Sequence, residues 1–211
     1  MVIVTLWALY TSRMYASIGS KNGVYMQADT LLLNRNSHPK LAGELPDADT
    51  LEFIYQAALR APDHGCIRPW RFIEFSGAGR ERLGEIFFRG LMARNPQADE
   101  AQQNKVRMMT LRAPLIIAVI AKVTEDHPKV PVIEQVLSAG AAAQNMMLAA
   151  YAKNLGAIWR TGDVAFDPVV NQELGLEGED QVVGYLYIGD VEGRNKPLPE
   201  HSTEDFVERW S

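Results

Sequence analysis

Five side chains with chemical character lie close together between residues 60 and 68. Arg60, Asp63, His64, Cys66 and Arg68 follow an apolar pattern with helical spacing and precede an alternating, strand-like run that begins at residue 70. A turn between a helix and a strand commonly carries binding residues, because it is exposed while the core holds both of its ends. We therefore expect this junction to hold a ligand.

A second polar set, Arg35-Asn36-Ser37, stands at the end of a short helical pattern. A planar guanidinium, an amide and a short hydroxyl in consecutive positions can chelate a phosphate group. The alternative is a capped helix end whose polar side chains are only solvated. Both interpretations of this set stay open on the residues alone.

Two further polar sets follow predicted strands. Trp159-Arg160-Thr161 ends a short apolar strand and precedes a glycine, so that its side chains project into the cleft at the strand edge. Packing in the core is the alternative role for Trp159, as for most buried tryptophans. Arg194 and Lys196 form a basic cluster after the last predicted strand. This cluster can return to a phosphate, or it can simply be solvated, as many charged loop residues are.

Other site chemistries are poorly supported. His64 and Cys66 are neighbours in a turn, which rarely aligns the nucleophile, base and orienting group of thiol catalysis. The four histidines have no spacing typical of zinc ligands, so we expect no metal site. Gly77-Ala78-Gly79 lacks the third glycine of a dinucleotide-binding turn and is better explained as a strand-to-helix turn.

The composition predicts one domain without nucleic-acid or membrane partners. With 211 residues, 47% of them hydrophobic, the chain can close a single core. The net charge of −5 and the pI near 5.4 argue against nucleic-acid phosphates as the main ligand. The apolar run 2–10 is too short to span a bilayer. A single cysteine fits a reducing compartment, and we expect a cytoplasmic protein.

Hydrophobic patterns predict strands interleaved with helices, which is typical of a sheet flanked by helices in the α+β class. The expected strands are 71–76, 115–122, 157–160 and 182–188. The expected helices are 29–34, 51–59, 81–92, 99–111, 131–154 and 167–175. We expect one mixed central sheet in an α/β-type sandwich.

The predicted helix 131–154 carries small residues nearly all the way round, so that other backbones can approach it closely. Such a helix is normally central in its domain or shared with a partner subunit. An ordinary core helix of a monomer is the alternative. Pro131 suits its first turn and Gly156 suits its C-cap.

Three of these motifs together carry a family resemblance. Arg60-Ala-Pro-Asp-His64, Leu32-Leu-Asn-Arg-Asn-Ser37 and Gly156-Ala-Ile-Trp-Arg-Thr-Gly162 resemble the FMN-dependent nitroreductase family, most closely its small YdjA-like NAD(P)H nitroreductases. The resemblance covers about residues 26–200, with the motifs in the family's order. It implies the nitroreductase fold, FMN as cofactor, NADH or NADPH as electron donor, and a homodimer with FMN at the subunit interface.

The resemblance also implies roles for individual residues. Arg60 and His64 would reach the flavin that is bound mainly by the other subunit. Further FMN contacts would come from Arg35, Asn36, Ser37, Trp159, Arg160, Thr161 and Arg194, and weaker NAD(P) contacts from Glu134, Gln135, Val136, Leu137 and Ser138. Asp63 would orient His64 or cap the turn.

Two positions depart from the family's usual residues. Asn36 stands where the family usually has a second arginine, which removes one cation from the predicted phosphate site. Arg68 stands where many relatives have a glutamine. If it faced the cofactor, Arg68 would stabilise a negative charge on reduced flavin; the alternative is that it faces solvent.

The implied reaction is a ping-pong transfer. FMN takes a hydride from NAD(P)H at its N5 atom and passes electrons to a nitroaromatic, a quinone or a similar small-molecule acceptor. No side chain need act as a nucleophile or a metal ligand. The alternative function is that of a flavin-binding regulator or storage protein of the same fold without efficient turnover.

The first 25 residues show no sustained period beyond their apolar run, and the family resemblance begins near Met26. We expect residues 1–25 to be an upstream translation of the reading frame, with Met26 as the natural start and residues 26–211 as the FMN-binding domain. The alternative is a loosely docked extension.

Overall fold

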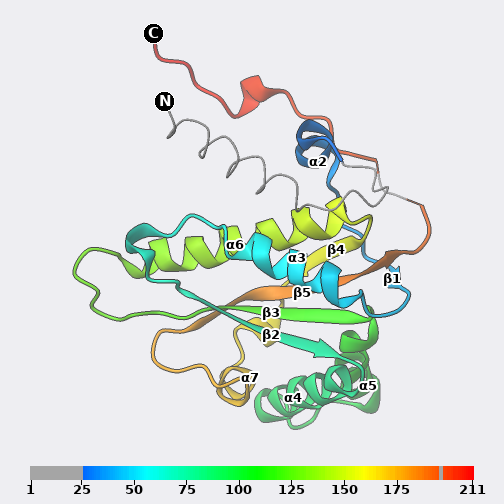
Figure 1. The fold of residues 1–211 in the computed structure, drawn as a ribbon. Helices are drawn as coiled ribbons and strands as arrows, with labels where there is room; N and C mark the ends of the chain where they lie inside the picture. The colour runs from blue at the N-terminus through cyan, green and yellow to red at the C-terminus, as the bar shows by residue number, and fades with distance from the viewer. Residues whose placement is uncertain (1–25, 195–196) are drawn as a thin grey trace, which may run out of the picture.

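The computed structural model describes residues 26–194 and 197–211, in which a five-stranded sheet lies between two layers of helices (Figure 1). The strands are β1 (Leu41–Ala42), β2 (Trp70–Ser76), β3 (Leu115–Ala121), β4 (Gly156–Arg160) and β5 (Gln181–Val191). The α-helices are α2 (Ala28–Asn34), α3 (Ala48–Ala58), α4 (Ala78–Arg94), α5 (Glu100–Met108), α6 (Val132–Ala152) and α7 (Pro168–Glu173). The 3-10 helices are η1 (His64–Cys66), η2 (Met109–Leu111), η3 (Asp163–Ala165) and η4 (Thr203–Asp205). The predicted α+β class is confirmed.

Two predictions fall on residues outside this description. The segment 1–25, expected to be an upstream translation of the reading frame or else a loosely docked extension, is one of them, and Lys196 of the basic cluster is the other.

The strand order is β1-β5-β3-β2, and β4 pairs with the part of β5 that precedes its pairing with β1. Each ladder within the described residues is antiparallel. The parallel component of the expected mixed sheet is confined to an isolated bridge between Ser37 and Ala157. Long connections can join strands in either direction, so the hydrophobic pattern alone does not decide the direction.

The middle strand, β3, divides the core into two clusters. All seven of its residues are buried. Successive side chains of a strand point to opposite faces. Ile116 belongs to the cluster that contains Phe87 of α4, whereas Ile117 belongs to the cluster that contains Met146 of α6. A strand buried on both faces is a continuous apolar run, which explains why β3 is predicted well.

The long helix α6 packs against the sheet and against α3 (Figure 1). Its small residues Ala139, Ala142 and Ala143 are buried. On the opposite side of the helix, Ile133 and Leu137 are 61% and 64% exposed. One side of the helix is therefore buried in the domain, and the opposite side exposes an apolar strip.

The C-terminal end of α6 differs from the prediction. The helix ends at Ala152, and Asn154, with φ of 62°, takes the left-handed conformation that follows it. Gly156, predicted as the C-cap, is instead the first residue of β4. A Cβ there would lie 2.7 Å from Leu41 Cδ2 and from Val191 Cγ2. Close packing of the strands therefore requires this glycine.

Candidate functional site

The loop 35–37 is attached to the beginning of β4. Ser37 forms the parallel bridge with Ala157, and His38 donates its backbone N–H to the Ala157 carbonyl over 3.0 Å. The second polar set, 159–161, lies at the other end of the same strand. A strand rises by about 3.3 Å per residue, so the two sets are separated by roughly 10 Å along β4. One short strand thus joins two sets that are far apart in the sequence.

Arginines of both sets carry buried donors. Nη1 of Arg35 and Nε of Arg160 are buried, and neither has a hydrogen-bond partner among residues 26–194 and 197–211. A buried donor left unpaired costs about 1–3 kcal/mol, and native structures rarely leave one so. Arg160 also lies over the ring of Tyr187, 5.7 Å from its centre. Oxygen atoms of a bound ligand would supply the missing acceptors.

Asn36 and His38 hold this loop in shape. Asn36 Oδ1 accepts the backbone N–H of Ser37 over 2.8 Å. His38 is 5% exposed. Its burial and, second, the charge of Arg35 lower the pKa of the imidazole below its ordinary value. A neutral His38 leaves Arg35 to supply the positive charge of the loop.

The predicted basic tail reaches the same region. Glu192 donates its backbone N–H to the Lys40 carbonyl over 3.2 Å, next to the pairing of β1 with β5. A cavity of about 230 Å³ there is lined by His38, Pro39, Lys40, Glu192, Gly193 and Arg194. Arg194 and Lys40 therefore add positive charge beside the loop 35–37. Sequence reasoning missed Lys40, although a cation directly after His38-Pro39 was a usable signal.

Trp159 is held by packing on both sides. One ring carbon lies 3.9 Å from the Cβ position of Gly140, and Nε1 lies 2.1 Å from that of Gly184. Nε1 donates to the Val183 carbonyl over 3.1 Å, at the point where β5 shifts register against β3. The indole N–H is thus engaged by the chain itself, and packing accounts for the position of this side chain. Thr161 beyond it is exposed.

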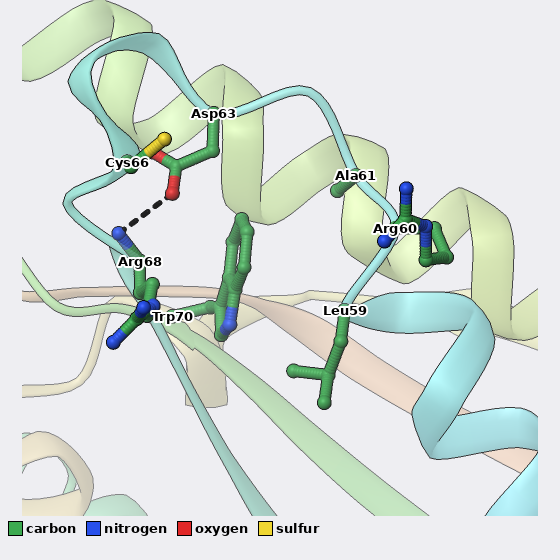
Figure 2. A pocket seen from close by; sticks show the side chains of 7 residues that line it. All are labelled: Leu59, Arg60, Ala61, Asp63, Cys66, Arg68 and Trp70. Atoms are coloured by element: carbon green, nitrogen blue, oxygen red, sulfur yellow. Dashed lines mark hydrogen bonds between the residues drawn. The ribbon is translucent and has the colours of Figure 1, made fainter. Parts of the chain in front are cut away.

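The junction between α3 and β2 is shaped by Asp63. Its Oδ1 accepts from the backbone N–H of Ile67 over 3.2 Å. Its Oδ2 accepts from the backbone N–H of Arg68 over 2.8 Å, as Figure 2 shows. Asp63 therefore caps the turn and does not orient His64. Cys66 and Arg68 have φ values of 54° and 52°, a left-handed region that non-glycine residues rarely adopt. The turn is thus a strained conformation that the Asp63 carboxylate helps to hold.

His64 pairs with α6 instead. Its Nδ1 lies 2.6 Å from Oε2 of Glu134, in the first turn of that helix. The two side chains are 58% and 45% exposed. An ionised carboxylate only accepts hydrogen bonds, so Nδ1 carries the proton and Nε2 remains for another partner. Glu134 is therefore the residue that orients His64.

The segment of α6 predicted to contact NAD(P) is partly buried. Gln135 is fully buried; its Oε1 accepts from the Thr124 N–H over 2.8 Å, and its Nε2 donates to the Thr124 and Val130 carbonyls over 3.0 Å. Ser138 donates to the Pro62 carbonyl over 2.6 Å. These two side chains hold neighbouring loops, and their assignment to a nicotinamide donor stays a prediction. The accessible members of the segment are Glu134, Val136 and Leu137.

A cavity of about 390 Å³ opens beside the junction, and Figure 2 shows the side chains that line it. Its polar lining consists of Arg60, Asp63, Cys66 and Arg68, and its apolar lining of Leu59, Ala61 and Trp70. This volume lies within the range of small-molecule sites.

The described part of the chain offers no candidate for a metal centre or a membrane-spanning helix. Within it, no group of three or more His, Cys, Asp or Glu residues could hold a metal ion. No helix in the same residues is long and apolar enough to cross a membrane.

Known proteins with similar sequences point to one family. The model of the Nitroreductase family matches residues 32–190. Putative NAD(P)H nitroreductase YdjA from Escherichia coli is 43% identical over 164 residues, which cover 78% of this chain and 88% of the relative. A Putative NAD(P)H nitroreductase from Haemophilus influenzae is 34% identical over 185 residues, which cover 86% of this chain and 98% of the relative.

Solved structures share the fold. A nitroreductase-like family protein from Bacillus cereus has a TM-score of 0.75 at 21% identity, over 89% of this chain and 98% of the other. A nitroreductase with bound FMN from Bacteroides fragilis has a TM-score of 0.64 at 20% identity, over 86% of this chain and 97% of the other. At these identities the solved structures show the fold alone, and the sequence matches identify the family. The chain therefore belongs to the nitroreductase family and is an oxidoreductase.

Proposed function

We propose that the chain binds FMN and passes electrons from NADH or NADPH to a small-molecule acceptor, such as a nitroaromatic or a quinone, by a ping-pong mechanism. The observation that carries the proposal is the pair of buried guanidinium donors on Arg35 and Arg160, which have no partner in the described residues. They belong to sets at the two ends of β4, which suits an elongated ligand with an anionic end. The relatives' names and the FMN of the Bacteroides fragilis structure support the same ligand.

The site residues divide by what they can bind. The loop 35–37, with Arg194 beside it, supplies a cation, hydroxyl and amide donors for the phosphate. Arg160 and Thr161 are assigned to the flavin end, with Trp159 packed behind them. When bound, FMN supplies the hydride chemistry that no side chain provides. The side chains hold and orient it, and a cation near the ring favours negative charge on the reduced form.

A homodimer completes the site in this proposal. His64 pairs with Glu134 in the first turn of α6, whereas Leu31, one turn before Arg35, shares a cavity with Ala149 near the end of α6. At a rise of 1.5 Å per residue, these two positions on α6 are roughly 22 Å apart. A second subunit would bring His64 to the FMN held by the first, whereas Arg60 lines the cavity with Leu31 in its own subunit.

Uncovered apolar side chains support a partner subunit. Large apolar residues of α2, α3 and α6, all in one helical layer, are between 43% and 75% exposed: Leu32, Leu33, Phe53, Ile133 and Leu137. Extensive exposed apolar surface usually marks an interaction site. We assign this layer to the interface between two copies of the chain.

Donor and acceptor use one cleft in turn. The accessible residues Glu134, Val136 and Leu137 are assigned to the nicotinamide donor. For a nitroaromatic acceptor, one NAD(P)H and one proton reduce the nitro group to a nitroso group and release water. Each turnover therefore transfers two electrons and two protons to the nitro group.

An anaerobic titration tests the proposed function. The purified protein is expected to show flavin absorption in the visible range, to be bleached by one equivalent of NADH or NADPH per flavin, and to recover its colour when a nitroaromatic or a quinone is added. Bound flavin that neither donor bleaches would favour the regulator or storage alternative. A protein that takes up no FMN would contradict the proposal.

A further inference from the structure

The 390 Å³ cavity beside the junction contains a positive charge that the proposed FMN site does not use. Arg68 lines this cavity and is exposed. Within the described residues, the hydrogen bonds of Arg68 involve only its backbone, so the guanidinium is available to a ligand. The two oxygens of Asp63 in the same lining face the N–H groups of Ile67 and Arg68.

The backbone is shaped to present Arg68 at this place. Its φ of 52° is unfavourable for a side chain with a Cβ. The carboxylate of Asp63 holds the Arg68 N–H, and the Arg68 carbonyl accepts from the backbone N–H of Trp70 over 2.8 Å. Strained residues that are fixed by specific contacts concentrate at binding sites. The turn therefore has the character of a built site and not of a solvated loop.

The wall next to Arg68 is apolar and aromatic. Trp70 is half-buried, and Leu59 is 49% exposed. Figure 2 shows the indole of Trp70 between the side chains of Arg68 and Arg60. A flat ring can stack on the indole while an oxyanion on that ring accepts from the guanidinium.

We propose that this cavity binds the anionic group of an aromatic electron acceptor, and that Arg68 is the residue that selects for it. The acceptor class is a nitroaromatic or quinoid ring that carries a carboxylate or a sulfonate. The inference rests on the proposed function, because Arg60 lines the cavity and is also assigned to FMN. A ring held against Trp70 would then share Arg60 with the flavin that would reduce it.

The test compares 4-nitrobenzoate with 4-nitrobenzamide, which carry a charged and a neutral group at the same ring position. The ratio of their kcat/KM values is measured at saturating NAD(P)H for the wild type and for Arg68→Gln. We expect this ratio to fall by about tenfold or more, the loss of one charge-assisted contact. Both acceptors take electrons from the same reduced flavin, so any loss of flavin or slower flavin reduction cancels in the ratio.

Two variants serve as controls. Arg68→Lys keeps the charge and is expected to retain part of the preference. Arg82→Gln removes the same charge from an exposed position on α4, in the opposite helical layer, and is expected to leave the ratio as it is. A ratio in Arg68→Gln within about twofold of the wild type, the scale of a solvated surface charge, overturns the proposal. So does an equal fall in Arg82→Gln.

The donor's phosphate is the competing source of an anion. If Arg68→Gln changes the ratio of NADPH to NADH use and leaves the acceptor ratio intact, the acceptor subsite is overturned. If the purified protein lacks flavin or turnover, the dissociation constants of the two nitro compounds, measured by calorimetry, replace kcat/KM. The dissociation constants then test the anionic subsite separately from the proposed function.

Discussion

Nδ1 of His64 lies 2.6 Å from Oε2 of Glu134, which joins the turn between α3 and β2 to the first turn of α6. The family resemblance assigns His64 to FMN and Glu134 to the nicotinamide donor. Their contact makes the two residues one unit, in which the carboxylate keeps the proton of a neutral His64 on Nδ1. Nε2 is then the ring nitrogen that remains for another partner.

Replacing Glu134 by alanine is expected to remove the Nδ1–H preference of neutral His64. The free energy of unfolding should change by less than about 1 kcal/mol, because both side chains are roughly half exposed. Long-range ¹H–¹⁵N NMR correlations report the tautomer. Glu81→Ala removes an acidic residue from the first turn of α4 and is the matched control. An unchanged tautomer in Glu134→Ala would show that the contact does not orient His64.

Arg35→Ala should weaken FMN binding without weakening the flavin-free fold. A charge-assisted contact contributes about 1.5–3 kcal/mol, so the dissociation constant for FMN should rise roughly tenfold to more than a hundredfold. The flavin-free protein loses a buried donor that has no described partner, so its melting temperature should stay constant or rise. Fluorescence titration with FMN measures the affinity, with Arg82→Ala as the control. An unchanged dissociation constant removes Arg35 from the site.

The flavin-free protein should lose stability as the pH falls below the ordinary histidine range. Burial and then Arg35 lower the pKa of His38, so the unfolded chain binds more protons than the native one around and below pH 6.5. Stability therefore rises with pH in that window, with a contribution from one proton of at most about 1.4 kcal/mol per pH unit. Urea unfolding at several pH values between 8 and 5 measures this dependence. The free energy of unfolding of His38→Gln should change less with pH than that of the wild type. At pH 8 the difference between the two proteins reports packing alone. If the free energies of unfolding of the two proteins change equally with pH, His38 does not cause the pH dependence.

Gly184→Ala should displace Trp159. The added Cβ would lie 2.1 Å from Trp159 Nε1 and 3.1 Å from the Arg160 carbonyl, so overpacking should cost about 1–3 kcal/mol. Gly79→Ala is the control, because a Cβ there meets nothing within 4 Å and alanine favours the helix by up to about 1 kcal/mol. Chemical unfolding measures both. Equal stability of the Gly184 variant and the wild type would mean that the indole packs elsewhere.

The elements with a sustained pattern are predictable from the sequence, and the short ones are not. The apolar run at 115–122 and the small-residue helix at 131–154 correspond to β3 and α6. β1 has only two residues, Leu41 and Ala42, and exists because β5 extends past β4 to Val191 and Asp190. No period can reveal a strand of that length.

The candidate site is predictable as a set of segments, whereas its contacts are not. Residue types mark 35–37, 60–68 and 159–161 as polar sets, but nothing in the sequence says that Asp63 turns to its own loop while Glu134 meets His64. Gln135 did carry a signal. It shares the helical stripe of Ala139, Ala142 and Met146, where a polar residue is buried and must pair with the chain itself.

Mixed dimers test the central claim, an FMN site shared by two subunits, most directly. Arg35→Ala and His64→Ala are each expected to have little turnover, because every site in either homodimer is defective. In a heterodimer one site carries both changes and the other carries neither. Co-expression of differently tagged chains should therefore restore about a quarter of wild-type turnover, since half of the dimers are mixed and half of their sites are intact. No recovery in purified heterodimers, or full turnover by a monomer, would contradict the shared site.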